Sequence, residues 1–169
     1  MENSTDESLF RKAMAAAYRH LARSPRSRAE IERKLAAGAY PGPVIRRAVE
    51  CLVSARYLDD FNFARQWSRD RAGRSGWGPS RLRAELQRKG IETESIEAAL
   101  RETFSEKSEE DRARELLERQ RSRRGLNLAD PRERRRWFGY LFRRGYSPEV
   151  IRGVFRSFER PGMEDDSAV

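Results

Sequence analysis

The chain has 169 residues, enough for one ordinary domain or for several small helical units that share a core. Its net charge of +9 and pI near 10.4 produce a field that attracts polyanions or acidic protein surfaces. The sequence contains no apolar run of transmembrane length and no signal peptide, so we expect a cytoplasmic protein with no membrane partner. The single cysteine, Cys51, excludes an internal disulfide and a multi-cysteine metal site, and His20 is the only histidine.

Helical signals follow one another from Ser8 to Phe158. Three of the expected helix starts carry a capping residue followed three positions later by an acid, which is typical of a capping box. These pairs are Ser27 with Glu30, Ser108 with Asp111, and Asp130 with Glu133. No stretch of strand length alternates between apolar and polar residues, so the sequence predicts an all-α protein. We expect residues 1–7 and 159–169 to be disordered tails.

An apolar pattern occurs three times along the chain, with offsets of 51 and then 55 residues. We interpret it as three tandem three-helix repeats over 8–58, 59–105 and 106–158, arranged as an elongated array because one small unit buries little surface alone. The repeated positions are Ile31, Leu35, Ile45 and Val49, then Leu82, Leu86, Ile96 and Leu100, then Trp137, Leu141, Ile151 and Phe155.

Two stretches of the middle repeat resemble the central signature of the bacterial RecX family of regulatory proteins. They read YLDDFNFARQW at 57–67 and GWGPSRLRAELQRKGI at 76–91. The first repeat departs from the family pattern at Arg56, where the family often has glycine, and in the loop AAGAYPG at 36–42. The residues that carry the resemblance are Tyr57, Leu58, Asp59, Asp60, Phe63, Ala64, Gly76, Trp77, Gly78, Pro79, Leu82, Glu85, Leu86 and Gly90.

The resemblance implies a regulator that binds the filament of the RecA recombinase. We expect a monomer with no cofactor and no enzymatic activity, because the sequence shows no candidate catalytic set. Proteins similar to this one lie in the groove of the RecA filament and inhibit its ATPase, strand-exchange and coprotease activities in recombination and the SOS response. Some of them also bind DNA. From the residues alone, a sequence-independent nucleic-acid-binding helical repeat protein is the alternative. A helix-turn-helix repressor fits less well, because no single recognition helix stands out.

Two neighbouring acids, Asp59 and Asp60, raise the question of a metal site or an acid–base pair. No third ligand at a useful helical spacing lies nearby, and we interpret Asp59 as the N-cap of a helix that starts near Phe61. His20 and Cys51 have no catalytic partner in the sequence, and we expect structural roles for both.

Trp77 stands between two glycines in the loop before an arginine-rich helix. A tryptophan held out on a loop could stack on bases or anchor a protein partner. Large aromatic side chains usually bury most of their area, however, so we predict that Trp77 packs inward onto its own repeat.

Arginine outnumbers lysine 32 to 4, which suits bidentate contacts to phosphate or carboxylate, or reflects a genome rich in arginine codons. The middle and last repeats share a basic stripe beside the apolar face, whereas the first repeat has Glu30 and Ala37 at the equivalent positions. We predict a surface for a polyanion or partner made of Arg71, Arg74, Arg81, Arg88, Lys89, Arg121, Arg123, Arg124, Arg132, Arg136 and Arg143.

Overall fold

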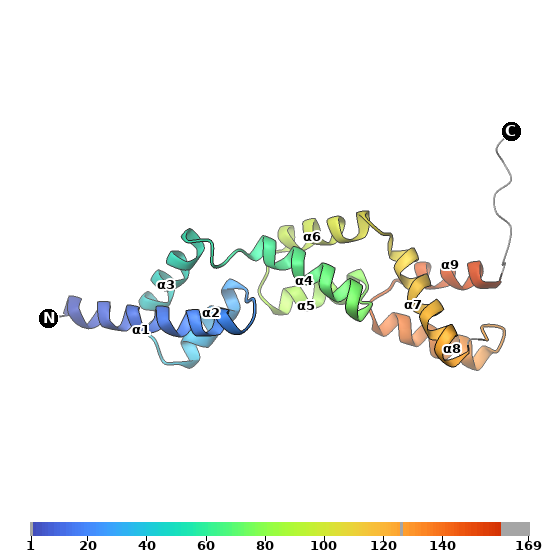
Figure 1. The fold of residues 1–169 in the computed structure, drawn as a ribbon, viewed down its shortest axis with the longest axis horizontal. Coiled ribbons are helices and arrows are strands. Elements are labelled where there is room, and N and C mark those ends of the chain that lie inside the picture. Colours follow the sequence, from blue (N-terminus) through green and yellow to red (C-terminus); the bar gives the residue numbers. More distant parts are fainter. Residues whose placement is uncertain (1, 126, 160–169) are drawn as a thin grey trace, which may run out of the picture. The chain divides into compact units, whose positions relative to one another are not determined.

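The computed structural model describes residues 2–125 and 127–159, and over these ranges it contains nine helices and no strand (Figure 1). The predictions of an all-α protein and of three-helix repeats in tandem are confirmed. Among the described residues, no helix combines the length and the apolar composition that a membrane span needs. The helices are α1 (Glu2–Arg23), α2 (Arg28–Ala37), α3 (Gly42–Ser54), α4 (Asp60–Ser75), α5 (Pro79–Arg88), α6 (Thr93–Ser105), α7 (Glu109–Arg124), α8 (Pro131–Arg143) and α9 (Pro148–Glu159).

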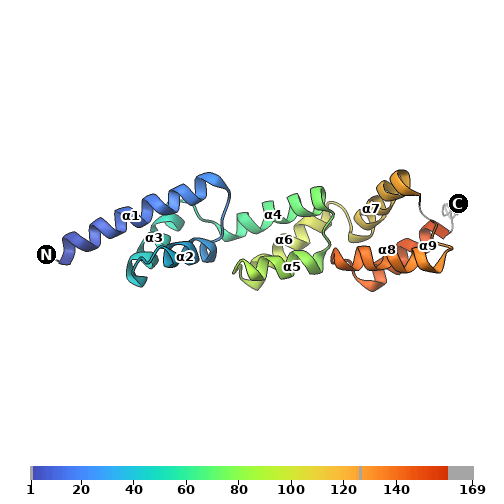
Figure 2. The ribbon, with the colours of Figure 1, turned by 90° about the horizontal axis from the view of Figure 1, so that it is seen from below.

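The chain forms two compact units, and the division between them passes through the middle repeat. The first unit comprises residues 1–67 and 85–99, and the second comprises residues 68–84 and 100–169. In the first unit α1, α2 and α3 pack against one another, and in the second α9 packs against α7 and α8 (Figures 1 and 2). All the apolar positions of the predicted threefold pattern are buried, from Ile31 to Phe155, which confirms the helical register inferred from the sequence.

The N-terminal end differs from its prediction, because α1 begins at Glu2 and includes residues assigned to a tail. Contacts with α3 help to explain the longer helix. Glu7 forms a 2.9 Å ion pair with Arg47, and the Arg47 guanidinium lies 4.0 Å from the centre of the Phe10 ring. The predicted C-terminal tail lies outside the described residues beyond the end of α9.

Most of the predicted helix caps form. Ser27 and Glu30 make a complete capping box at the start of α2, and the Ser108 hydroxyl accepts a hydrogen bond from the amide of Asp111. Asp130 caps α8 but accepts from the amide of Arg132. Its predicted capping-box partner, Glu133, instead accepts a 2.9 Å bond from the Trp137 indole N–H, so this box is not completed.

In the first unit, the loop before α2 lies against the turn between α5 and α6. The Ser27 hydroxyl donates a 2.6 Å hydrogen bond to the Lys89 carbonyl, and the Lys89 ammonium pairs with Glu30 at 2.9 Å. Burial disfavours the Glu30 carboxylate, but the bonds to Lys89 and Ser27 outweigh that cost and hold its pKa below the usual value. Gly90 has φ of +78°, and a Cβ there would lie only 2.4 Å from the Cβ of Ala29.

In the second unit, the loop before α5 lies against the turn between α8 and α9 in the same way. The Gly78 amide donates a 2.7 Å bond to the Arg144 carbonyl, and the Ser80 amide donates a 3.1 Å bond to the Gly145 carbonyl. A Cβ on Gly78 would lie 2.6 Å from the Gly145 carbonyl oxygen, and a Cβ on Gly145 would lie 2.3 Å from the Arg81 amide nitrogen. Only glycine permits this approach of two backbones.

These two contacts are one structural joint that occurs twice. Gly90 and Gly145 occupy the same position of the repeat, separated by the offset of 55 residues. The first repeat has Ala39 there, with φ of +57°, so its backbone adopts the same left-handed conformation. Ala39 is exposed, and its Cβ is therefore tolerated at the cost of the unfavourable φ alone. This explains why the loop at 36–42 departs from the pattern of the other repeats.

We predict opposite effects of glycine and alanine exchanges at this repeat position. Ala39→Gly should raise the free energy of unfolding by about 0.5–1 kcal/mol, because it relieves the positive φ. Gly90→Ala and Gly145→Ala should each lower it by roughly 2 kcal/mol or more, since strain and steric clash add. Urea unfolding followed by circular dichroism measures all three. If the exchanges at residues 39 and 145 changed the free energy of unfolding by the same amount and in the same direction, the steric role of Gly145 in the joint would be wrong.

A second prediction concerns Tyr146, which is 1% exposed and whose hydroxyl has no hydrogen-bond partner among the described residues. Burial raises the pKa of Tyr146 from 10.0 to about 12. Its contribution to stability is therefore intact below pH 10 and is lost between pH 10 and 12, where the unfolded chain releases the proton first. Tyr146→Phe should raise the free energy of unfolding at pH 7 by about 1 kcal/mol and weaken this alkaline loss. Unfolding by urea at pH 7 and pH 11 tests it, and a lower stability at pH 7 would show that the hydroxyl is satisfied.

Candidate partner-binding groove

The positive charge of the chain is concentrated in the second unit. That unit carries 22 basic against 15 acidic residues, whereas the first carries 14 against 12. The second unit thus holds +7 of the net charge of +9. An anionic partner is therefore attracted mainly to the second unit.

A groove of about 740 Å³ lies within this unit, between the end of α4, the start of α5, the middle of α7 and the end of α8. Six of the residues that line it are arginines, and none is an aspartate or a glutamate. Its lining consists of Arg74, Ser75, Gly76, Trp77, Arg81, Leu116, Arg119, Gln120, Arg123, Tyr140, Arg143 and Arg144.

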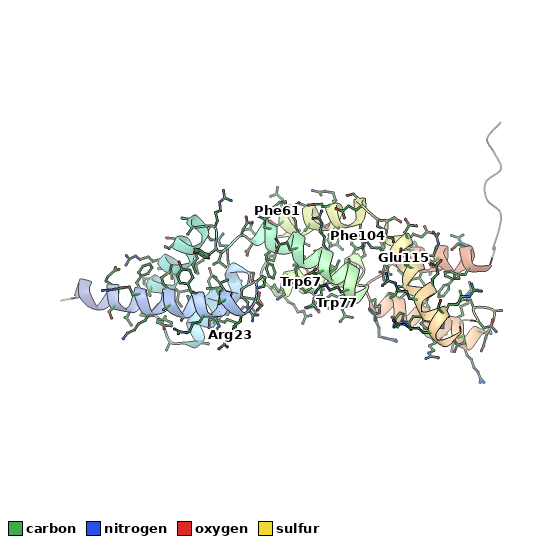
Figure 3. The ribbon with its side chains drawn as sticks, in the orientation of Figure 1. Arg23, Phe61, Trp67, Trp77, Phe104 and Glu115 are labelled. Atoms are coloured by element: carbon green, nitrogen blue, oxygen red, sulfur yellow. The ribbon has the colours of Figure 1, made fainter. Side chains whose placement is uncertain are left out.

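Trp77 is half-buried on one wall of this groove, in the loop between α4 and α5 (Figure 3). The guanidinium of Arg81 lies 4.0 Å from the centre of its ring, and that of Arg71 lies 5.5 Å from it. Arg81 also donates a 3.3 Å hydrogen bond to the Arg143 carbonyl. Trp77 therefore packs onto its own repeat less completely than predicted, and it holds an arginine at the groove.

Tyr140 and Arg144 form a similar arrangement on the α8 side. The Arg144 guanidinium lies 4.6 Å from the centre of the Tyr140 ring and donates a hydrogen bond to the Ser75 carbonyl. The Tyr140 ring also meets Trp137 edge to face, with centroids 5.4 Å apart. Aromatic rings and backbone carbonyls thus hold Arg81 and Arg144 in place, and cation–π contact adds to this restraint.

The fold brings together four of the arginines predicted from the sequence, Arg74, Arg81, Arg123 and Arg143. Sequence reasoning missed Arg119, Arg144 and Tyr140. The sequence contained a signal for two of these three residues, Arg119 and Arg144. Arg119 stands four residues before Arg123 on the same helix face, and Arg144 occupies the repeat position of Lys89.

The remaining predicted arginines lie outside the groove. Arg71 contacts Trp77 without lining the groove, while Arg121 and Arg132 are exposed. Arg136 pairs with Glu133 at 3.3 Å. The side chain of Arg124 lies outside the described residues.

Two predicted cations belong to the first unit. Arg88 pairs with Glu85, and the Lys89 ammonium lies 5.5 Å from the Phe63 ring and 5.7 Å from the Trp67 ring, besides its bond to Glu30. Lys89 thus contributes to the joint of that unit.

The signature residues have mostly structural positions. Asp59 accepts a 2.9 Å bond from the amide of Asn62 and so caps α4, as predicted. Asp60 accepts a 2.8 Å bond from the Arg28 amide at the start of α2, while burial raises its pKa above the usual value. Pro79 begins α5 and Tyr57 is 58% exposed. The remaining apolar members are buried, and they are Leu58, Phe63, Ala64, Leu82 and Leu86.

Comparison with known proteins places the whole helical array in one family. Three family models match in order along the chain: the first three-helix domain of RecX at 13–52, the second at 59–100 and the third at 108–155. A regulatory protein RecX of Mycobacterium sp. (strain JLS) is 39% identical over 149 residues, which is 85% of this chain and 81% of the relative. A regulatory protein RecX of Trichlorobacter lovleyi is 35% identical over 127 residues, covering 75% and 82%.

Solved structures agree on the fold. The crystal structure of RecX from Lactobacillus salivarius matches with a TM-score of 0.77 and 21% identity, over 90% of this chain and 98% of that one. A second crystal structure of a regulatory protein RecX matches with a TM-score of 0.74 and 22% identity, over 86% and 72%. With all three domain models matched in order, this chain belongs to the RecX family of regulatory proteins.

Proposed function

We propose that this protein binds the filament of the RecA recombinase and mainly inhibits its ATPase, strand-exchange and coprotease activities. The match of three RecX domain models in order, with regulatory relatives over most of the chain, is the observation that carries the proposal. In this role the protein acts in recombination and in the response to DNA damage, as a monomer.

The second unit supports this proposal with a surface suited to an anionic partner. Its groove gathers six arginines, and exposed arginines on α7 and α8 continue the positive charge outside it. We include in the proposed surface the full set named from the sequence: Arg71, Arg74, Arg81, Arg88, Lys89, Arg121, Arg123, Arg124, Arg132, Arg136 and Arg143.

A filament is a polymer, so one molecule bound in its groove or at its end affects many protomers. The mechanism we propose is therefore occupation of the filament rather than competition for single subunits. This distinguishes it from the second candidate, a nucleic-acid-binding protein that removes DNA from the recombinase. The concentration of positive charge in the second unit is the observation that favours this second candidate.

We predict that titration into preformed RecA filaments lowers ATP hydrolysis at molar ratios well below one. A protein that competes for DNA should instead inhibit in proportion to the DNA sites, with a log–log salt slope of about −0.9 per phosphate contact on duplex. Steady-state ATP hydrolysis, measured from trace to equimolar amounts at two salt concentrations, separates the two. Absence of inhibition at every ratio would defeat the proposed function, even if the protein bound DNA strongly.

Charge reversal in the groove provides the matched experiment. Arg123→Glu with Arg143→Glu should weaken inhibition by about tenfold or more, because both arginines are exposed at the groove and face the anionic partner. Arg23→Glu with Arg46→Glu makes the same change of charge at exposed positions of the first unit and should leave inhibition nearly unchanged. Equal losses in both variants would mean that net charge alone matters.

A further inference from the structure

The groove of the second unit holds more positive charge than its surroundings neutralise. Of its six arginines, Arg74 pairs with Asp70 at 3.9 Å and Arg119 pairs with Glu115 at 3.6 Å. The other four form no ion pair with any carboxylate of the described residues, and they are Arg81, Arg123, Arg143 and Arg144. Arg81 and Arg144 are half-buried and Arg123 and Arg143 are exposed, so the groove offers four unpaired cations to an anionic ligand.

Two of these four guanidinium groups are fixed before any ligand arrives. Arg81 stacks on Trp77 and bonds to the Arg143 carbonyl, while Arg144 stacks on Tyr140 and bonds to the Ser75 carbonyl. A planar guanidinium presents several N–H donors, and these contacts use only some of them. A fixed guanidinium fork matches carboxylate and phosphate groups equally well.

The aromatic residues of the groove do not offer a platform for bases. Single-stranded nucleic acids are commonly bound by stacking of bases on open aromatic faces. Here guanidinium groups approach the Trp77 ring at 4.0 and 5.5 Å, and the Tyr140 ring is contacted by Arg144 and Trp137. A single strand would therefore contact the groove through its phosphates alone.

The shape and the floor of the groove also argue against a duplex. Duplex DNA is stiff over far more than the length of this site, so it would reach only the exposed arginines at the rim of a hollow of about 740 Å³ and not its apolar lining. The groove is also lined in part by apolar groups, with Leu116 in contact with the loop at Gly76. A peptide is narrow enough to enter and brings apolar side chains to cover such a floor.

We propose that the groove binds an acidic peptide segment of a partner protein, in which carboxylates flank one apolar side chain. The carboxylates pair with Arg81, Arg123, Arg143 and Arg144, and the apolar side chain packs on Leu116 at the edge of the Trp77 ring. This inference deepens the proposed function and rests on it for one point, that the segment belongs to the recombinase partner. The peptide-binding property itself is tested without the recombinase.

The probe is the fluorescein-labelled peptide Ser-Asp-Glu-Leu-Glu-Asp-Ser, with fluorescence anisotropy as the readout on the full chain. We expect it to bind, and we expect its neutral counterpart Ser-Asn-Gln-Leu-Gln-Asn-Ser to bind at least about tenfold more weakly. Replacing the central leucine by serine should also weaken binding, because the peptide then loses its apolar contact in the groove. Equal binding of the acidic and neutral peptides would overturn the proposal.

Matched variants locate the binding. Arg123→Gln with Arg143→Gln should raise the Kd of the acidic peptide by about tenfold, since both arginines are exposed and unpaired at the groove. Arg135→Gln with Arg152→Gln removes the same charge at exposed positions of the second unit outside the groove and should leave the Kd unchanged. Circular dichroism checks that every variant keeps its helicity. Equal effects of the two double variants would also overturn the proposal.

Competition decides between a peptide and a nucleic acid. An oligothymidylate that binds more tightly than the peptide, and that loses affinity in the Arg123→Gln/Arg143→Gln variant alone, would show that the groove is a nucleic-acid site and overturn the proposal. If the wild-type chain binds the peptide but leaves RecA ATP hydrolysis unchanged, the proposed function fails while the peptide site stands. If the groove variant no longer binds the peptide but inhibits RecA ATP hydrolysis as strongly as the wild type, the acidic segment does not belong to the recombinase.

Discussion

The structure depends on a joint in which the loop before one helix rests on the backbone of a later turn. In the second unit a Cβ on Gly78 would clash with the Gly145 backbone and a Cβ on Gly145 would clash with Arg81, while the Gly78 amide donates a 2.7 Å hydrogen bond to the Arg144 carbonyl. Because no side chain lies between the two backbones, rotamer changes cannot alter this contact. It therefore sets the register between helices more tightly than apolar packing alone. Of the two glycines that flank Trp77, Gly78 is therefore needed for this close contact, whereas Gly76 has φ of +61°.

The same joint assembles the groove. By fixing the turn after α8 against the loop before α5, it brings Arg143 and Arg144 beside Trp77 and Arg81. The first unit builds the equivalent joint differently, with the Ser27 hydroxyl as donor and with Lys89 paired to Glu30. A carboxylate therefore neutralises the cation at the first joint, whereas Arg144 at the second has only a ring and a carbonyl. The repeat is the same, but only its second joint leaves charge available for a partner.

The sequence was informative where local physics decides the outcome. Leu82 and Leu86 are buried because a helix returns to the same face every three to four residues, and Asp59 caps α4 because its carboxylate lies next to free amides. Charge alone could not show that Lys89 is paired with Glu30, 59 residues earlier, or that Tyr140 would meet Arg144 at the groove. The half-buried state of Trp77 likewise depends on contacts between segments distant in sequence, which periodicity does not contain.

Four of the six arginines at the groove form no ion pair with a carboxylate of the described residues, and like charges gathered on one surface repel one another. Stacking on Trp77 and Tyr140 and bonds to backbone carbonyls offset part of this cost but neutralise none of the charge. Solvated arginines spread over a helix surface would avoid the repulsion altogether. A cluster of like charges in which rings hold Arg81 and Arg144 in place is therefore better explained by an anionic ligand than by solubility, which needs only scattered charge.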